Sequence, residues 1–381
     1  MKRGALFFVE FWRIKQKLLS LCQQGLFDKT VTQNNAFRTI PKSLPQTLQN
    51  LFKSLIVRLI NHISDLLKYA EKLFSNNVPV IYNTSHLASL VGYRKEYLKR
   101  AAVYTNSYYR NFNIKKKNGK NRLISEPLPS LKDIQIWILE NILSNVEISP
   151  FAKAYRKGVG LWDNLKFHKD QPKLFTIDIS NFFTSIKIHS IQQIFSDLGY
   201  SSFISNLLAR LCTKDHCLPQ GAPTSPYLSN IFFRATDKKI SEYCVANKIK
   251  YTRYADDLSF SGDFDEKPLK SLINQYIGEL GLQINDSKTR VMLPNSRQIV
   301  TGIVVNKIPQ VPFCKRNKLR QNIYFIKKFG IKNHIKHEGI TQSNYIEHLL
   351  GQVSFILHIN PKDEEFKSYQ RYLKSLIIKQ L

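Results

Sequence analysis

The sequence predicts an α+β fold, in which helices surround a small sheet, and three observations support this. Apolar residues recur every three or four positions in residues 48–74 and 131–143, the period of an amphipathic helix. Short β-prone runs occur elsewhere, at residues 174–177 and on both sides of position 255. Two adjacent acids at residues 256–257 lie between two such runs, so we expect a strand–turn–strand hairpin to carry them.

The composition predicts a globular protein with a polyanionic partner. The chain has 381 residues, enough for two or three subdomains with sizeable cores, and 43% of them are apolar. The 57 basic residues outnumber the 28 acidic ones and give a formal net charge of +29. Such an excess is typical of nucleic-acid binding, which then weakens steeply with salt. An acidic protein or a membrane surface is the alternative partner.

Charge and pattern divide the chain into residues 1–78, 79–310 and 311–381. Residues 1–80 carry 12 Lys and Arg against 4 Asp and Glu, and residues 311–381 carry 13 against 5. Both ends are therefore net positive by eight. This distribution suits a protein that wraps RNA over a wide surface, although a solvated basic face has the same composition.

Residues 1–78 are predicted to form a helical N-terminal extension. Helical spacing occurs in residues 11–22 and 48–74, whereas residues 30–45 are polar, contain two prolines and are interpreted as a linker. The extension has two possible roles, a helical cap or a docking face for another protein. Charges interrupt its apolar start at Glu10 and Arg13, and no run of about twenty apolar residues follows, so neither a signal peptide nor a membrane helix is expected.

The cysteines are few and odd in number, which fits a reducing compartment without a disulfide framework. They are Cys22, Cys212, Cys217, Cys244 and Cys314. Cys212 and Cys217, with His216 between them, suggest a zinc site. Because no second ligand pair stands nearby, we prefer buried thiols.

The acids at the hairpin form the strongest candidate site. Asp256 and Asp257 would repel each other at a turn unless cations neutralise them, and Asp178 ends another apolar run. Three carboxylates at strand ends can hold two Mg²⁺ ions roughly 4 Å apart. The alternative for a lone pair of acids is a solvated turn.

The surrounding motifs resemble those of a reverse transcriptase. Asp-Ile-Ser-Asn-Phe-Phe at 178–183 resembles the first catalytic motif of the polymerase palm, and Leu-Pro-Gln-Gly at 218–221 resembles the template- and nucleotide-contacting loop. Tyr-Ala-Asp-Asp at 254–257 and Gly-Leu-Gln-Ile-Asn at 281–285 follow in the family's order. Over roughly residues 80–381, this resemblance implies a right-hand polymerase with fingers, palm and helical thumb.

The elements can be placed in this order along the chain. A β-hairpin over residues 112–124 and the helix at 131–143 resemble the fingers. Most aromatics before the hairpin are expected to pack in the core. Palm elements follow, with helices near residues 190–198, 203–212, 226–244 and 268–280 and a strand near 300–306. Helices at 318–328 and 345–358 resemble the thumb, which holds the product duplex by its backbone.

Two further strings narrow the family. Asn-Leu-Lys-Phe-His at 164–168 is similar to the Asn-Ala-x-x-His signature of retron reverse transcriptases, with Leu165 in place of Ala. Val-Thr-Gly at 300–302 matches a second retron signature. The resemblance implies priming from a guanosine 2′-hydroxyl of the enzyme's own noncoding RNA, a branched RNA–DNA product and an effector protein in anti-phage defence. One alternative is another bacterial reverse transcriptase, of the group II intron or abortive-infection type. The end of the chain at Leu381 disfavours the intron type. The other alternative is an RNA–DNA scaffold that restrains a toxin.

The resemblance also assigns roles to single residues. The catalytic acids are Asp178, Asp256 and Asp257, and the metal ligands are these three with Ile179. The deoxynucleotide contacts are Lys116, Arg122, Phe183, Gln220 and Lys288. The nucleic-acid contacts are Asn164, His168, Tyr254, Val300, Thr301 and Gly302. Three alternatives stay open: a core histidine at 168, a surface lysine at 288 and core roles for both Phe182 and Phe183.

The predicted cofactor is Mg²⁺, as two ions, with Mn²⁺ as a possible substitute. The predicted partners are the cognate noncoding RNA, its DNA product, deoxynucleotides and an effector protein, with higher-order assembly possible and no membrane. The expected location is the bacterial cytoplasm.

Overall fold

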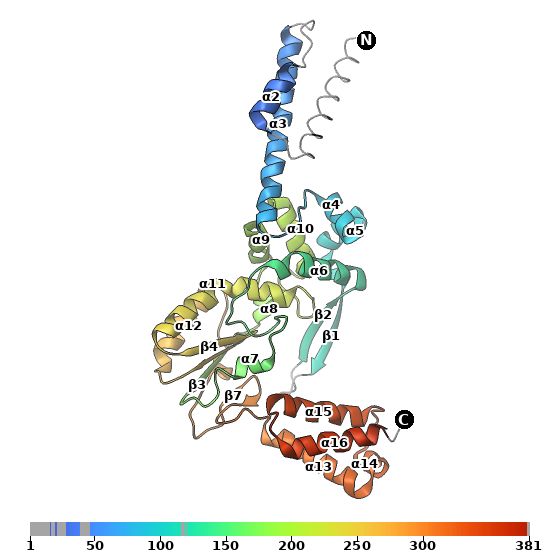
Figure 1. Ribbon diagram of the computed structural model, residues 1–381, viewed down its shortest axis with the longest axis vertical. Helices are drawn as coiled ribbons and strands as arrows, with labels where there is room; N and C mark the ends of the chain where they lie inside the picture. Colours follow the sequence, from blue (N-terminus) through green and yellow to red (C-terminus); the bar gives the residue numbers. More distant parts are fainter. Residues whose placement is uncertain are drawn as a thin grey trace. The chain divides into compact units, whose positions relative to one another are not determined.

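The computed structural model describes residues 16, 20, 28–38, 46–115, 119 and 121–378 (Figure 1). The chain divides into two compact units. The first unit comprises Met1–Lys95 with Phe195–Asn206, and the second comprises Glu96–Ile194 with Leu207–Leu381. This division falls at Lys95, not at residue 78, and it adds a later segment to the N-terminal unit. Within the described residues, no helix is both long and apolar enough to span a membrane.

The first unit is built on the long helix α3 (Gln46–Ser75), which confirms the helix predicted over residues 48–74. Helix α2 (Lys29–Arg38) precedes it, so the predicted linker over residues 30–45 is wrong for its first part. The two prolines stand after α2, and Ala36 packs against Phe52 and Ile56 of α3. The helix predicted over residues 11–22 lies, except for residues 16 and 20, outside the described residues.

The end of α3 is fixed by hydrogen bonds within the same unit. Tyr69 donates to the carbonyl of Ile81 at 2.8 Å, and Tyr200 donates to that of Pro79 at 2.9 Å. Burial raises the pKa of both phenols, so they remain neutral donors. Helix α4 (Thr84–Val91) follows, and Asn83 caps its N-terminus through the amide of His86. These contacts bring residues 195–206 into the first unit.

The second unit begins with helix α5 (Lys95–Val103), the 3₁₀ turn η1 (Thr105–Tyr108) and an antiparallel hairpin of β1 (Tyr109–Lys115) and β2 (Asn121–Pro127). The hairpin confirms the prediction. Helix α6 (Pro129–Asn141) and the turn η2 (Leu143–Asn145) follow. Buried Gln135 of α6 donates to the Tyr109 hydroxyl at 2.8 Å and to the Leu211 carbonyl at 2.7 Å, which fixes the base of the hairpin. Of the aromatics expected to be core, Tyr109 is buried, whereas Tyr104 and Phe112 are exposed.

The centre of this unit is a four-stranded antiparallel sheet in the order β4-β5-β3-β6. Its strands are β3 (Leu174–Asp178), β4 (Lys250–Tyr254), β5 (Asp257–Ser261) and β6 (Arg290–Met292). Short helices α7 (Leu161–Leu165) and α8 (Phe182–Ser185) flank β3 in sequence. The predicted longer helices are α9 (Ile188–Asp197), α10 (Ser202–Cys212), α11 (Ser225–Ala246) and α12 (Glu266–Glu279). In Figure 1, α11 and α12 lie beside the sheet.

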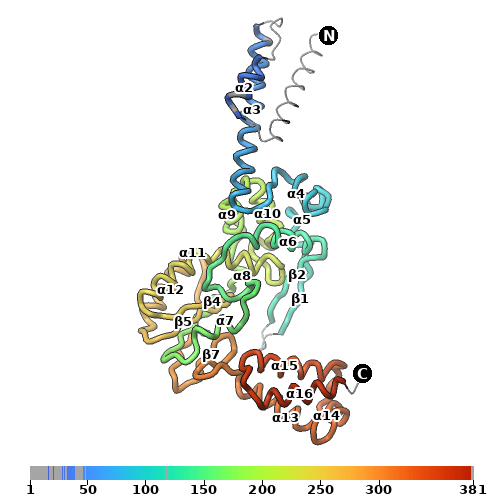
Figure 2. The backbone as a smooth tube through the Cα atoms, viewed as in Figure 1, coloured from blue at the N-terminus to red at the C-terminus, as the bar shows by residue number. Residues whose placement is uncertain are grey.

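The C-terminal part is helical, as predicted, but contains more strands and helices than the sequence predicted. A small hairpin of β7 (Ile299–Val300) and β8 (Ile303–Val304) replaces the single strand predicted near residues 300–306. Four helices follow, α13 (Phe313–Phe329), α14 (Ile331–Glu338), α15 (Tyr345–Ile359) and α16 (Glu364–Ile378), and Figure 2 traces them as one group. Their apolar core is continuous with Val300 and Leu174, so it joins the sheet.

A buried ion pair joins α11 to the sheet. Arg253 of β4 and Asp237 of α11 are both fully buried, and the guanidinium binds the carboxylate through two bonds of 2.9 and 2.7 Å. Its third nitrogen donates to Asn230 and to the carbonyl of Ala255, each at 3.1 Å. Its planar group also lies 4.6 Å from the ring centroid of Phe233. Arginine suits this site because its fixed fork satisfies several acceptors at once.

We predict that Arg253→Met destabilises the protein by about 3–5 kcal/mol, because it leaves the Asp237 carboxylate buried without a counter-charge. The double variant Arg253→Met/Asp237→Leu should recover much of that loss. The measurement is the free energy of unfolding by denaturant titration. As a control, Lys239→Met breaks the exposed Lys239–Glu279 pair and should cost less than about 1 kcal/mol. Equal losses for Arg253→Met and the control would contradict the prediction.

Candidate active site

The three predicted catalytic acids meet at one edge of the sheet. Asp178 ends β3 and stands opposite Asp257, the first residue of β5, in the antiparallel register. Asp256 lies in the two-residue turn before Asp257, and its carbonyl accepts a bond from the Ile179 amide at 3.0 Å. Ala255, the first residue of that turn, has a φ of 59°, a left-handed conformation that such hairpin turns require. The bond from Arg253 to its carbonyl helps to hold it there.

The surroundings of Asp256 and Asp257 disfavour their ionised forms. Burial is the main cause that raises the pKa of Asp256, and the nearby Asp178 carboxylate adds to it. Burial, followed by the charges of Asp256 and Asp178, raises the pKa of Asp257 to about 7. Asp257 therefore needs positive charge nearby to ionise fully at neutral pH.

Lys288 supplies part of that charge. Its ammonium group lies 2.8 and 2.9 Å from the two carboxylate oxygens of Asp178, and the Asn285 amide donates to one of them at 3.1 Å. Lys288 belongs to the 3₁₀ turn η3 (Asp286–Lys288), which Asn285 ties to the end of β3 through its own backbone amide. Lys288 is therefore in direct contact with Asp178, one of the three predicted catalytic acids.

The donor set suits a hard divalent cation. Within the described ranges, no group of three or more His, Cys, Asp or Glu side chains is arranged to hold a metal ion. Lys288 instead engages both oxygens of Asp178. The carboxylates of Asp178, Asp256 and Asp257 are nevertheless ligands that Mg²⁺ prefers, and two of them have raised pKa values that a cation would lower. Ile179 lies beside them, almost fully buried.

Arg122 and Gln220 line one cavity of about 250 Å³ next to α8. The carbonyl of Gln220 accepts a bond from the Ser125 amide at 2.7 Å, so β2 holds the Gln220 loop. Gly221 is required there, because it has a φ of 127° and a Cβ would lie 2.7 Å from the Ser125 carbonyl oxygen. The charge of Arg122 also acts on Asp256. Lys116, the other predicted phosphate contact, lies outside the described residues.

Two aromatic residues after Asp178 have different surroundings. Phe182 is buried and packs edge-on against Phe233, as expected for the core. Phe183 is half-buried, and its ring centroid lies 6.3 Å from that of Tyr155. Tyr155 is a site residue that the sequence did not suggest. Burial first, and then the charge of Asp256, raises the pKa of this phenol, which places it near the acids. The predicted Tyr254 ends β4 directly opposite Asp257.

Asn164 and His168 lie in the interior of the protein. Both are fully buried. The two ring nitrogens of His168 lie 2.7 Å from the hydroxyls of Ser261 and Thr252, and Thr252 donates to Asn164 at 2.6 Å. Burial lowers the pKa of His168 to about 3, so the ring is neutral. These contacts fit the alternative of a satisfied core histidine and show no direct contact surface for RNA.

The Val-Thr-Gly segment forms the turn between β7 and β8. Val300 is fully buried in the core shared with the C-terminal helices. Thr301 and Gly302 have φ values of 45° and 81°, the pattern of a tight two-residue hairpin turn. Gly302 is exposed, and the Thr301 hydroxyl has no hydrogen-bond partner among the residues that the structure describes. The Thr301 hydroxyl is itself buried, so Gly302 is the exposed residue of the three.

The cysteines differ in exposure. Cys212 and Cys244 are buried, and burial raises the pKa of each thiol to about 12. Cys217 is half-buried and donates to the carbonyl of Lys214, whereas Cys314 is exposed. Cys22 lies outside the described residues.

Comparison with known proteins identifies the family of this chain. Residues 114–340 match the reverse transcriptase (RNA-dependent DNA polymerase) family. The Ec86 retron reverse transcriptase of Escherichia coli is 32% identical over 296 residues, which cover 76% of this chain and 89% of that protein. The Mx162 retron reverse transcriptase of Myxococcus xanthus is 27% identical, with 76% and 67% covered. A foamy viral protease–reverse transcriptase bound to double-stranded DNA has a TM-score of 0.40 at 16% identity, covering 71% of this chain and 39% of that one.

These similarities identify the protein as an RNA-directed DNA polymerase. The chain belongs to the reverse transcriptases, and within them to the retron type.

We predict that His168 makes the stability of the protein depend on pH. Its folded-state pKa lies below its unfolded value of about 6.5, so its contribution is present above that pH and is lost as the pH falls toward 3. The loss should approach about 1.4 kcal/mol per pH unit. Denaturant titrations of wild type and His168→Gln between pH 7.5 and 5 would measure it.

The variant should have the flatter pH dependence, whereas His337→Gln, which changes an exposed histidine, should match wild type. Identical slopes for wild type and His168→Gln would contradict a buried neutral ring.

Proposed function

We propose that this enzyme copies part of its own structured noncoding RNA into DNA. Synthesis would start from a guanosine 2′-hydroxyl of that RNA and leave a branched RNA–DNA hybrid. The observation that carries the proposal is the pairing of Asp178 with Asp257 at the sheet edge, in a chain of the retron type. Retron relatives match over most of the chain and most of their own length, which favours this chemistry over that of an intron or abortive-infection enzyme.

The parts of the molecule have separate roles in this proposal. The β1–β2 hairpin with α6 serves as the fingers, the four-stranded sheet with α11 and α12 as the palm, and α13 to α16 as the thumb. The hairpin reaches the palm through the Gln220 loop, since Ser125 of β2 holds the carbonyl of Gln220. An incoming deoxynucleotide would therefore lie between Arg122 and the acids.

The side chains at this place bind and orient the reactants. Arg122 binds phosphate oxygens through its planar fork, and Gln220 contacts the sugar. Phe183, held by Phe182 and Tyr155, lies against the sugar C2′ and excludes a ribose hydroxyl. Tyr254 contacts the primer end. The acids Asp178, Asp256 and Asp257, with the carbonyl of Ile179, would hold two divalent ions, Mg²⁺ in our proposal, which activate the attacking hydroxyl and stabilise the leaving pyrophosphate.

Lys288 has two roles in this proposal, one before and one during the reaction. In this structure its ammonium group neutralises Asp178. Its side chain is more than half exposed, so it can turn away from Asp178 when another cation binds there. It would then lie near the leaving pyrophosphate and donate a proton to it.

The two retron-specific segments have different roles in this proposal, one indirect and one by contact with the RNA. Asn164 and His168 brace strands β4 and β5 from the core, so their effect on RNA passes through the position of the acids. Thr301 and Gly302 would contact the RNA from the exposed turn, with Val300 as its anchor. We further propose that the enzyme works in the bacterial cytoplasm with an effector protein in anti-phage defence, as retron enzymes do, and that it can join a larger assembly.

The decisive test is the double variant Asp256→Asn/Asp257→Asn. DNA synthesis should fall by about a thousandfold or more, because charge stabilisation worth several kcal/mol is lost, while RNA binding persists. The assay expresses the gene with its flanking DNA and examines co-purifying nucleic acid on a denaturing gel, before and after RNase and debranching enzyme. Wild type should yield a short discrete DNA whose mobility changes on debranching. A DNA that debranching leaves unchanged would contradict 2′-hydroxyl priming, and synthesis by the variant would contradict the assigned acids.

We also predict that Mg²⁺ stabilises the protein more at pH 8 than at pH 6. The folded-state pKa of Asp257, about 7, lies above its unfolded value, so its contribution to stability is lost as the pH rises through 7. A cation binds the ionised form and restores that stability. Melting temperatures with Mg²⁺ or EDTA at both pH values would measure it. Asp256→Asn/Asp257→Asn serves as the control and should show little response to Mg²⁺ at either pH.

A further inference from the structure

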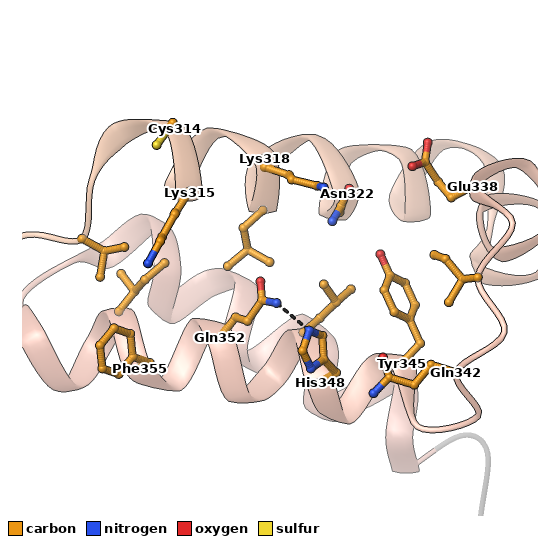
Figure 3. Close-up of a pocket in the computed structure, with 15 residues that line it drawn as sticks. Cys314, Lys315, Lys318, Asn322, Glu338, Gln342, Tyr345, His348, Gln352 and Phe355 are labelled. Carbon is orange, nitrogen blue, oxygen red and sulfur yellow. Dashed lines mark hydrogen bonds between the residues drawn. The ribbon is translucent and has the colours of Figure 1, made fainter. Parts of the chain in front are cut away.

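A large groove lies between α13 and α15. It has a volume of about 890 Å³ and lies away from the acids, on residues that the proposed chemistry does not use. Figure 3 shows Lys315 reaching from α13 toward α15, with Phe355 and Gln352 opposite. Glu338 and Tyr345 lie at the other end of the groove.

The cations of α13 fall into two groups. Arg316 binds Asp363, just before α16, and Arg320 binds Glu365 in its first turn. Both guanidinium groups lie over the ring of Phe366. They hold the helices together. Lys315 and Lys318 line the groove on the other side, are exposed, and form no ion pair within the part of the chain that the structure describes.

The groove offers the three kinds of contact that a nucleic-acid strand needs. The two lysines suit phosphates, and the half-exposed ring of Phe355 offers a face on which a base can stack. Asn322 and Gln352 carry amides, which can both donate to and accept from a 2′-hydroxyl. Glu338, at the far end, repels phosphate and therefore confines the backbone to the lysine end.

The width of the groove favours a single strand over a duplex as its ligand. A double helix is wider than the space between two neighbouring protein helices, whereas one strand with free bases can lie along such a space. Buried Leu319, Leu349 and Ile356 form an apolar floor for the bases.

We propose that the α13–α15 groove binds an unpaired segment of RNA, with phosphates at Lys315 and Lys318 and a base on Phe355. This proposal rests on the proposed function in one respect, namely that the enzyme holds a structured RNA while it copies it. The groove would hold an unpaired part of that RNA away from the acids, and so fix which region stays uncopied.

Cys314 provides a probe at the groove itself. It lines the groove and is exposed, whereas Cys212 and Cys244 are buried. An unstructured oligouridylate of about ten nucleotides, within the usual site size of single-strand binders, should slow alkylation of Cys314 severalfold, as read by peptide mass spectrometry. A duplex RNA of equal length should not protect it, and a single-stranded DNA oligomer of equal length should protect it less. Equal protection by DNA would overturn the assignment to RNA, and no protection would overturn the site.

Matched variants test the contacts. Lys315→Gln/Lys318→Gln should lower the slope of log affinity against log salt by about 1.4, since each phosphate contact on a single strand contributes about 0.7. Lys362→Gln/Lys374→Gln removes the same charge from exposed positions elsewhere and should leave the slope unchanged. Phe355→Ala should weaken binding about tenfold and Phe355→Tyr should not. Equal effects of both lysine pairs would overturn the proposal.

One further measurement separates the two proposals. The wild-type preparation is assayed for metal-dependent extension of a DNA primer on an RNA template. Extension without protection of Cys314 would overturn the groove proposal alone. Protection of Cys314 without extension would support the groove proposal and contradict the polymerase assignment.

Discussion

The arrangement of the acids depends on the buried contact between Arg253 and Asp237. This one guanidinium binds the carboxylate of α11, the amide of Asn230 and the carbonyl of Ala255, so it joins a helix, a strand and the turn that carries Asp256. The backbone of Arg253 also pairs with residues 151 and 153. The turn needs a residue in the left-handed conformation, and that residue is Ala255, for which this conformation is unfavourable. The hydrogen bond from Arg253 to the Ala255 carbonyl helps to hold it there.

Sequence alone predicted the parts of the site that are local. The alternation of β-prone runs and the paired acids were enough to place Asp256 in a hairpin turn, and Asp178 at a strand end. The helix over residues 48–74 followed from its apolar period. Helices α14 and α16 were not predicted, and α2 was mistaken for a linker, because its polar sequence is helical only through a few contacts with α3.

Long-range contacts explain what the sequence could not show. His168 contacts Thr252 and Ser261, which lie 84 and 93 residues further along the chain. The sequence of residues 164–168 does not reveal that Asn164 and His168 are buried in the core. Tyr155 lies near the acids, in a loop where its own φ is 61°. No local sequence pattern predicts this left-handed conformation. Lys288 was placed near the site by resemblance, but its bond to Asp178 depends on how Asn285 folds back onto β3.

The protein separates its structural cations from those left free for ligands. Arg253, Arg316 and Arg320 are paired with carboxylates and lie against aromatic rings, where a rigid planar fork is an advantage. Lys315 and Lys318 stay exposed, and Lys288 holds Asp178 from a side chain that is more than half exposed. An ammonium on a flexible stem can leave one partner for another at low cost, whereas a buried arginine cannot. At these positions the arginines hold the fold, whereas Lys315 and Lys318 stay available to a polyanion.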